Sequence, residues 1–156
     1  MENIIINKNL KLKFSLLQIT YWCTIGAFSG FMVSYMQTKG MTPKLIGVML
    51  SVSTLCAFLG QLFWGSLSDK IKSNKKIFII TNILMFILHI VVFYMPSYTL
   101  VIITFGVLGF VEIPVAANLD TWILKIYYKT PQAYGPIRAC ASIGFAIFTL
   151  IYGGLI

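Results

Sequence analysis

Five apolar runs follow one another along this chain, separated by short polar segments. The hydrocarbon core of a bilayer, about 30 Å thick, requires an α-helix of about 20 apolar residues to cross it. Hydrophobic residues make up 58% of the 156 positions and charged residues only 10%, a balance that a soluble domain of this size would not have. We therefore predict an all-α membrane protein with five transmembrane helices, at Phe14 to Met36, Leu45 to Leu67, Ile77 to Met95, Thr99 to Ile123 and Gly135 to Ile156.

The lysines lie mainly on one side of the predicted membrane. Three precede the first run, four lie between the second and third, and two between the fourth and fifth, whereas the opposite side has only Lys39 and Lys44. By the positive-inside rule, this asymmetry places residues 1–13 in the cytoplasm. We predict a multi-pass protein of the plasma (inner) membrane. Its net charge of +8 serves orientation and contact with anionic lipid, and no nucleic-acid partner is expected.

A twelve-residue segment, Gly65 to Lys76, is predicted to be a short loop between the second and third helices. It resembles the loop between helices 2 and 3 of the major facilitator superfamily, written Gly-x-x-x-Asp-Arg/Lys-x-Gly-x-Arg/Lys-Arg/Lys. The segment departs from this pattern at Lys72, where the family has Gly, and we expect Asn74 to supply the left-handed turn instead. The final basic pair comes one residue later than usual. The matching positions are Gly65, Asp69, Lys70, Lys75 and Lys76.

The resemblance implies that this segment is a cytoplasmic gating loop. Its acid, Asp69, would pair with a neighbouring group in one transport state and release it in another. A solvated loop that orients the protein explains the lysines equally well, and only Gly65 together with Asp69 favours the gating role. Gly65 would allow close helix contact, and a carboxylate at a helix C-terminus is unfavourable unless another group pairs with it.

Three charged residues fall within the predicted spans: Glu112, Asp120 and Arg138. Each costs about 2.5 to 3.5 kcal/mol at the centre of a membrane helix, so such residues usually pair or line a wet cavity. Asp120 lies nine residues before Lys129, at the centre of the turn, and Arg138 nine after it, which predicts similar depths on neighbouring helices. Two interpretations are open, a structural ion pair and a pair that binds a polar solute. Glu112 could face the same cavity or bond a neighbouring helix.

The start of the fifth run, Tyr134 to Ala146, resembles helix 5 of the lactose permease, or oligosaccharide:proton symporter, branch of the superfamily. That branch has an aromatic-Gly-x-x-Arg pattern, an aromatic residue seven positions after the Arg, and a sugar-binding acid eighteen positions before it. The resemblance implies substrate-binding roles for Asp120, Arg138, Phe145 and Ser142, and a proton-coupled transporter of a small polar solute such as a sugar. Asp and Phe stand where the branch has Glu and Trp, and branches that carry nucleosides or aromatic acids share much of the pattern.

Superfamily members contain two halves built from three-helix units. Residues 14–156 would supply helices 1–5 of an N-terminal half, so we expect a fragment, with the proton-carrying residues in missing C-terminal helices. A truncated protein that does not transport, or a half-module that needs a partner chain, is the alternative.

No enzyme signature is present. The sequence has no paired-His metal motif, no nucleophile at useful spacing from a base and no phosphate-binding Gly loop. We therefore predict no catalytic residues, no metal and no cofactor, and expect the partners to be a small solute, a proton and the lipid bilayer.

Overall fold

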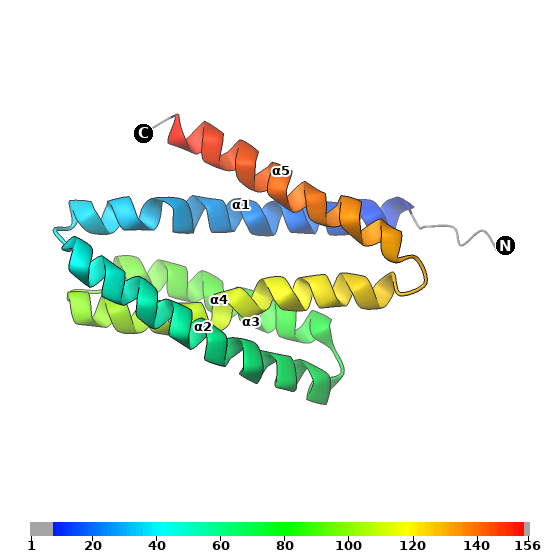
Figure 1. Ribbon diagram of the computed structural model, residues 1–156, viewed down its shortest axis with the longest axis horizontal. Helices are drawn as coiled ribbons and strands as arrows, with labels where there is room; N and C mark the ends of the chain where they lie inside the picture. The colour runs from blue at the N-terminus through cyan, green and yellow to red at the C-terminus, as the bar shows by residue number, and fades with distance from the viewer. Residues whose placement is uncertain (1–7, 155–156) are drawn as a thin grey trace. The chain divides into compact units, whose positions relative to one another are not determined.

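The computed structural model describes residues 8–154, apart from the side chains of Ser29 and Tyr152. The described residues are helical with short connections and contain no strand. Figure 1 shows their order: α1 (Lys8–Thr38), α2 (Pro43–Ile71), α3 (Asn74–Phe93), α4 (Tyr98–Ile126), a 3₁₀ turn η1 (Pro131–Ala133) and α5 (Tyr134–Gly153).

The predicted all-α fold class is confirmed. Five helices of the described chain are long and apolar enough to cross a membrane. The observed helices mostly extend beyond the predicted runs by several residues, because apolar patterning detects only the part that lies in hydrocarbon. The predicted N-terminal segment 1–13 lies outside the described residues at positions 1–7, and its remaining residues already belong to α1.

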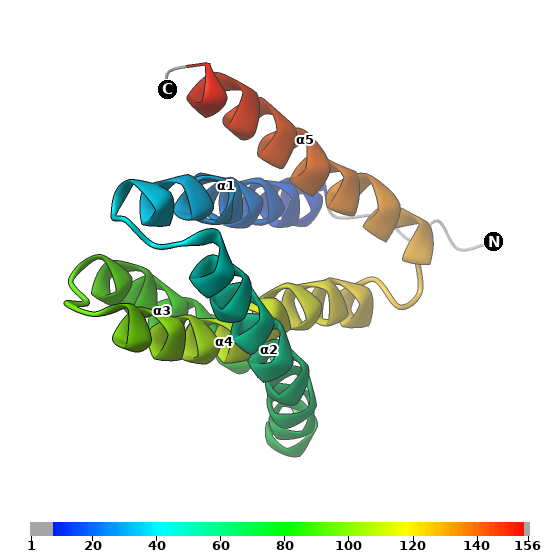
Figure 2. The same ribbon diagram turned by 60° about the vertical axis from the view of Figure 1, so that its left-hand side comes forward.

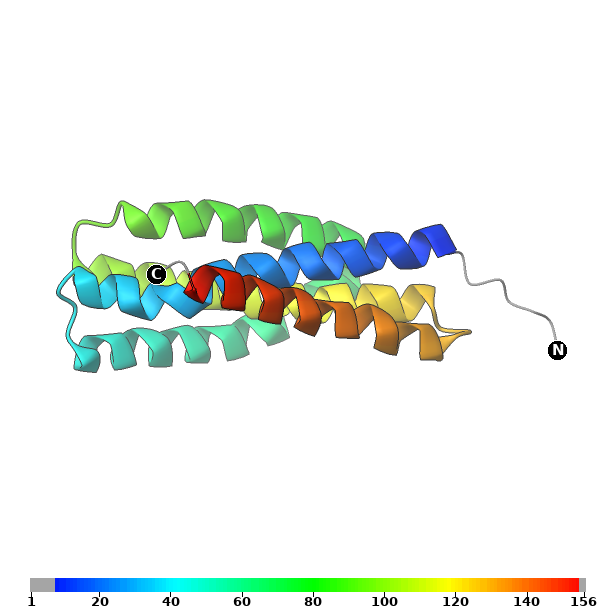
Figure 3. The same cartoon turned by 90° about the horizontal axis from the view of Figure 1, so that it is seen from above.

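The chain forms two compact units. The terminal unit comprises Met1–Ser34 and Ile123–Ile156, and the central unit comprises Tyr35–Trp122. Within the terminal unit, α5 crosses α1 (Figure 3), and two glycines lie at this crossing. A Cβ on Gly26 would come within 3.2 Å of the Phe145 ring, and a Cβ on Gly144 within 3.0 Å of the Ile19 side chain. The two helices can approach closely because these positions have no side chain.

Where α4 ends, the terminal unit also buries Tyr127. Its ring packs edge-on against Phe14, with centroids 6.4 Å apart. The Tyr127 hydroxyl has no hydrogen-bond partner in the described chain, and its burial raises the pKa of this side chain.

Within the central unit, α2 crosses α4, as Figure 2 shows. A Cβ on Gly60 would overlap the carbonyl oxygen of Phe110, and a Cβ on Gly109 would overlap the carbonyl oxygen of Ser53. Pro114 lies inside α4 and has no N–H, so it cannot donate the helical hydrogen bond to Phe110. Gly60 therefore lies against a carbonyl that has lost its usual donor.

The connection between α2 and α3 differs from the prediction in two ways. The predicted twelve-residue loop is wrong, because only Lys72 and Ser73 separate the helices. Asn74 does not supply the left-handed turn: it is the first residue of α3, and Lys72 has φ +55°. The hydroxyl of Ser73 caps α3 by accepting from the N–H of Lys76 at 3.4 Å, which explains why α3 begins so early. The left-handed residue is thus the one that stands where the superfamily pattern has Gly.

We expect Gly60→Ala to destabilise the central unit by about 2 kcal/mol or more, since the new methyl group would overlap rigid helix backbone rather than a flexible side chain. Gly47→Ala is the matched control on the same helix, because a Cβ there would meet nothing within 4 Å. Thermal unfolding of both variants in the same detergent measures the difference. Equal midpoints for the two variants would contradict the observed packing of α2 on α4.

We expect Lys72→Gly to stabilise the protein by about 1 kcal/mol, because a residue with a Cβ in the left-handed region costs about 1–2 kcal/mol and Gly adopts it readily. Lys72→Ala removes the same charge but keeps the Cβ, so it should not stabilise. Thermal unfolding of the two variants separates the backbone effect from the charge effect. A Gly variant no more stable than the Ala variant would show that position 72 is not left-handed.

Candidate functional site

A small cavity in the terminal unit has the composition of a binding site. It has a volume of about 170 Å³ and is lined by Trp22, Arg138, Ser142 and Phe145. Arg138, Ser142 and Phe145 are separated by four and three positions on α5, which places them on one face of that helix. Trp22 comes from α1, opposite this face. The cavity therefore combines one cation, one hydroxyl and two aromatic rings.

The guanidinium of Arg138 lies over the Trp22 ring, 4.7 Å from its centroid. A cation in this position is attracted by the electron-rich face of the ring. Trp22 also meets Phe145 edge-on, with centroids 6.3 Å apart and an interplanar angle of 82°. Its indole N–H donates to the side-chain oxygen of Gln18 at 3.1 Å. These contacts fix the ring that in turn positions the guanidinium.

The α1–α5 crossing supports this arrangement. The thiol of Cys23 donates to the Gly144 carbonyl at 3.4 Å, one turn of α1 away from the Phe145 contact at Gly26. Since Trp22 is next to Cys23 on α1, the crossing fixes the distance between the indole and the cation on α5.

The structure brings together three of the four predicted substrate-binding residues, Arg138, Ser142 and Phe145. Asp120 is half-buried on α4 in the central unit, so its pairing with Arg138 stays a prediction. Glu112 is also half-buried on α4.

Sequence reasoning missed Trp22 and Gln18. The available signal was a Gln and a Trp one helical turn apart inside an otherwise apolar run. The signal gave no partner for Trp22, because its neighbours on α5, Arg138 and Phe145, are more than a hundred residues away in sequence.

The predicted gating segment lines a second cavity, of about 230 Å³, in the central unit. Gly65 and Asp69 of α2 contribute to it, with Asn118 of α4 and Asn74 of α3. The two Asn side chains are hydrogen-bonded at 3.4 Å, and the Asn118 amide also donates to the Pro114 carbonyl at 2.9 Å. The cavity is thus a polar one, built around the turn from α2 to α3.

The prediction that Gly65 allows close helix contact is wrong for this structure, since a Cβ there would meet no described neighbour within 4 Å. Gly65 faces the cavity instead. The buried hydroxyl of Ser68, which also lines the cavity, has no hydrogen-bond partner in the described part of the chain. Asp69 and the lysines of the segment are exposed: Lys70, Lys72, Lys75 and Lys76.

Among the described residues, no three His, Cys, Asp or Glu side chains lie close enough together to bind a metal ion. The cysteines at positions 23, 56 and 140 are free thiols.

Comparison with known proteins agrees with the helical pattern. Residues 10–156 match the model of the MFS_1 like family. A protein of Escherichia coli (strain K12) named "Probable 3-phenylpropionic acid transporter" is 25% identical over 144 residues, which cover 88% of this chain and 36% of that protein. The chain thus spans about a third of the length of that relative. No solved structure matches this chain. The specific resemblance to the lactose permease branch finds no support in these matches. Because the family match covers nearly the whole sequence, this chain belongs to the MFS_1 like family, a family of major facilitator transporters.

Proposed function

We propose that this chain forms the N-terminal part of a secondary active transporter whose solute is a small carboxylate with an aromatic ring. One observation carries the proposal: Arg138, Trp22 and Phe145 surround the same cavity. The relative named as a 3-phenylpropionic acid transporter supports the same class of solute.

The chemistry of the cavity fits such a solute. A guanidinium presents five N–H donors in a plane and binds a carboxylate through two parallel hydrogen bonds. The rings of Trp22 and Phe145 offer edges and faces against which an aryl group packs. Ser142 can donate one further hydrogen bond. A single cation beside two aromatic rings favours a solute that is negatively charged at one end and apolar at the other.

A sugar is the second candidate solute, and the position of Asp120 favours it. The acid stands eighteen residues before Arg138, as in the oligosaccharide:proton symporters that the sequence resembles. An Asp and an Arg together offer acceptors and donors for several hydroxyl groups. In this interpretation Phe145 stacks on the sugar ring. The two candidates differ in whether Asp120 contributes to binding.

Proton coupling, orientation and gating belong to the same proposal. The lysine asymmetry supports a cytoplasmic N-terminus in the plasma (inner) membrane. The polar cavity beside Gly65 and Asp69 would receive a group from helices or a partner chain beyond this sequence in one transport state. Proton-carrying residues would belong to those same helices. A protonophore that abolishes accumulation of the solute would support the coupling.

We expect Arg138→Lys to lower uptake of 3-phenylpropionate by about tenfold or more, because Lys cannot form the bidentate pair with a carboxylate. Uptake and membrane abundance are measured in cells that express the native gene product. Lys129→Arg, the reverse exchange at an exposed position in the α4–α5 connection, is the control and should leave both unchanged. Loss of abundance in the Arg138 variant would assign it a structural role. Absence of any uptake by the unmodified protein would favour the non-transporting alternative.

Asp120→Asn separates the two solutes. If the solute is a sugar, removing the carboxylate removes a charged acceptor, and uptake should fall by about tenfold or more. If it is an aromatic acid, uptake should be retained, because a negatively charged side chain is not expected to contribute to binding an anion. Competition by unlabelled galactoside and 3-phenylpropionate against each labelled solute gives the measurement. Retained galactoside uptake in this variant would contradict a sugar site that uses Asp120.

A further inference from the structure

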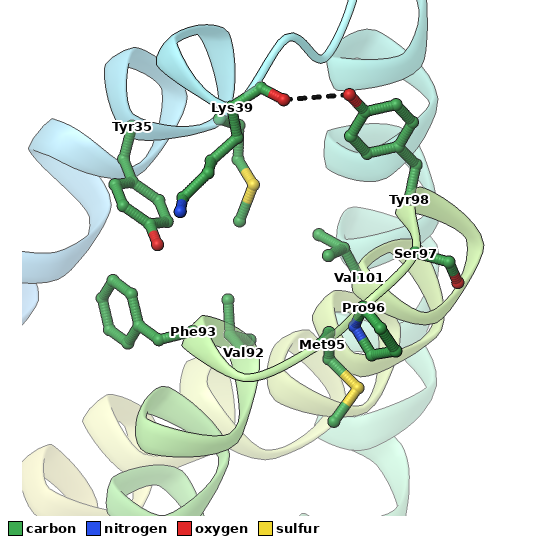
Figure 4. Close-up of a pocket in the computed structure, with 10 residues that line it drawn as sticks. Tyr35, Lys39, Val92, Phe93, Met95, Pro96, Ser97, Tyr98 and Val101 are labelled. Atoms are coloured by element: carbon green, nitrogen blue, oxygen red, sulfur yellow. Dashed lines mark hydrogen bonds between the residues drawn. The ribbon is translucent and has the colours of Figure 1, made fainter.

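The central unit contains a larger cavity, of about 480 Å³, at the end of the helices where α1 and α3 finish and α4 begins. Figure 4 shows Tyr35 and Lys39 entering it from α1 and from the residue after it, opposite Val92 and Phe93 of α3. Val101 of α4 also lines it. None of these residues lines the cavity beside Arg138 or belongs to the segment Gly65 to Lys76.

The floor of this cavity is apolar. Met36, Val92 and Val101 line it and are each no more than 5% exposed. Its far wall is an aromatic pair, Tyr35 and Phe93, with centroids 5.1 Å apart and an interplanar angle of 67°. Such a surface contributes binding energy only to a ligand that has an apolar part.

The rim of the cavity is positive. Lys39 is its only charged lining residue, and the Lys39 ammonium lies 5.5 Å from the centroid of the Tyr35 ring. Ser97 and Tyr98 form the N-terminal end of α4, where the partial positive charge of the helix favours an anion. The lining residues include no carboxylate that would neutralise Lys39.

The rim is also held in place. The Tyr98 hydroxyl donates to the Lys39 carbonyl at 2.9 Å, joining the turn after α1 to the first residue of α4 (Figure 4). The next residue, Gly40, has φ +83°, and a Cβ on it would come within 3.1 Å of the Tyr98 oxygen. A side chain at position 40 would therefore strain the turn and crowd this hydrogen bond.

Helix ends lie at the membrane–water interface, so this cavity lies at the depth of lipid headgroups, on the side opposite the Lys70–Lys76 cluster. We propose that it binds an acidic phospholipid, with the phosphate against Lys39 and the N-terminus of α4, and apolar chain against Met36, Val92 and Val101. The charge complementarity and the apolar floor carry this inference, which does not depend on the identity of the transported solute.

The test uses native mass spectrometry of the native gene product in detergent. It compares the binding of phosphatidylglycerol and phosphatidylcholine that have the same acyl chains. Lys39→Gln should lower the affinity for phosphatidylglycerol by about tenfold, as expected for one charge-assisted hydrogen bond. The affinity for phosphatidylcholine should fall less, because its choline ammonium already offsets the charge of the phosphate. Lys39→Arg should restore binding. Lys44→Gln is the matched control: it removes an exposed lysine at the start of α2, five residues away and outside the cavity lining.

Three outcomes would overturn the proposal. Unchanged phosphatidylglycerol affinity in the Lys39→Gln variant would show that Lys39 does not contribute to lipid binding. Equal losses in the Lys39→Gln and Lys44→Gln variants would show only general attraction between lysines and anionic lipid. Displacement of the lipid by inorganic phosphate at similar concentration would show that the apolar floor contributes nothing. Lys39 is exposed, so its replacement should not unfold the chain, and circular dichroism checks this.

Discussion

A bilayer supplies no water to an unpaired backbone group, and every helix of this chain must satisfy its own carbonyls and amides. Pro114 breaks this rule in the middle of α4, because it has no N–H to offer Phe110. The close approach of Gly60 covers the affected carbonyl with another helix instead of lipid. The contact between α2 and α4 thus separates this carbonyl from lipid. It also positions the cavity beside Asp69, which both helices line.

The terminal unit has a charged group, Arg138, within a predicted membrane span, and this group also needs compensating contacts. A guanidinium within a membrane span is costly unless its environment compensates. The indole of Trp22 provides an electron-rich face, and Gln18 and Phe145 hold that face in position. Glycines at the α1–α5 crossing make the geometry possible. Close helix packing therefore comes first, and the chemistry of the cavity lined by Arg138 depends on it.

Much of the fold could be predicted from sequence, because a membrane-spanning helix needs a long apolar run and few other structural elements have one. The α2–α3 turn could not, since the hydroxyl of Ser73 started α3 earlier than hydropathy indicates. Arg138, Ser142 and Phe145 could be grouped from their spacing on one helix. Trp22 could not be added to them, because its position depends on how two helices cross. That crossing depends on Gly26 and Gly144, and nothing local to Trp22 encodes it.

Charge decides between the solutes that the cavity could hold. An arginine beside aromatic rings, with no carboxylate among its lining residues, matches an anion with an apolar body. A neutral sugar needs acceptors as well as donors, since each hydroxyl both donates and accepts. Asp120 is the residue that would add such acceptors, at the cost of neutralising the charge that attracts an acid. Under the proposed function, one cavity would not serve both solutes well, so the participation of Asp120 would determine the substrate class.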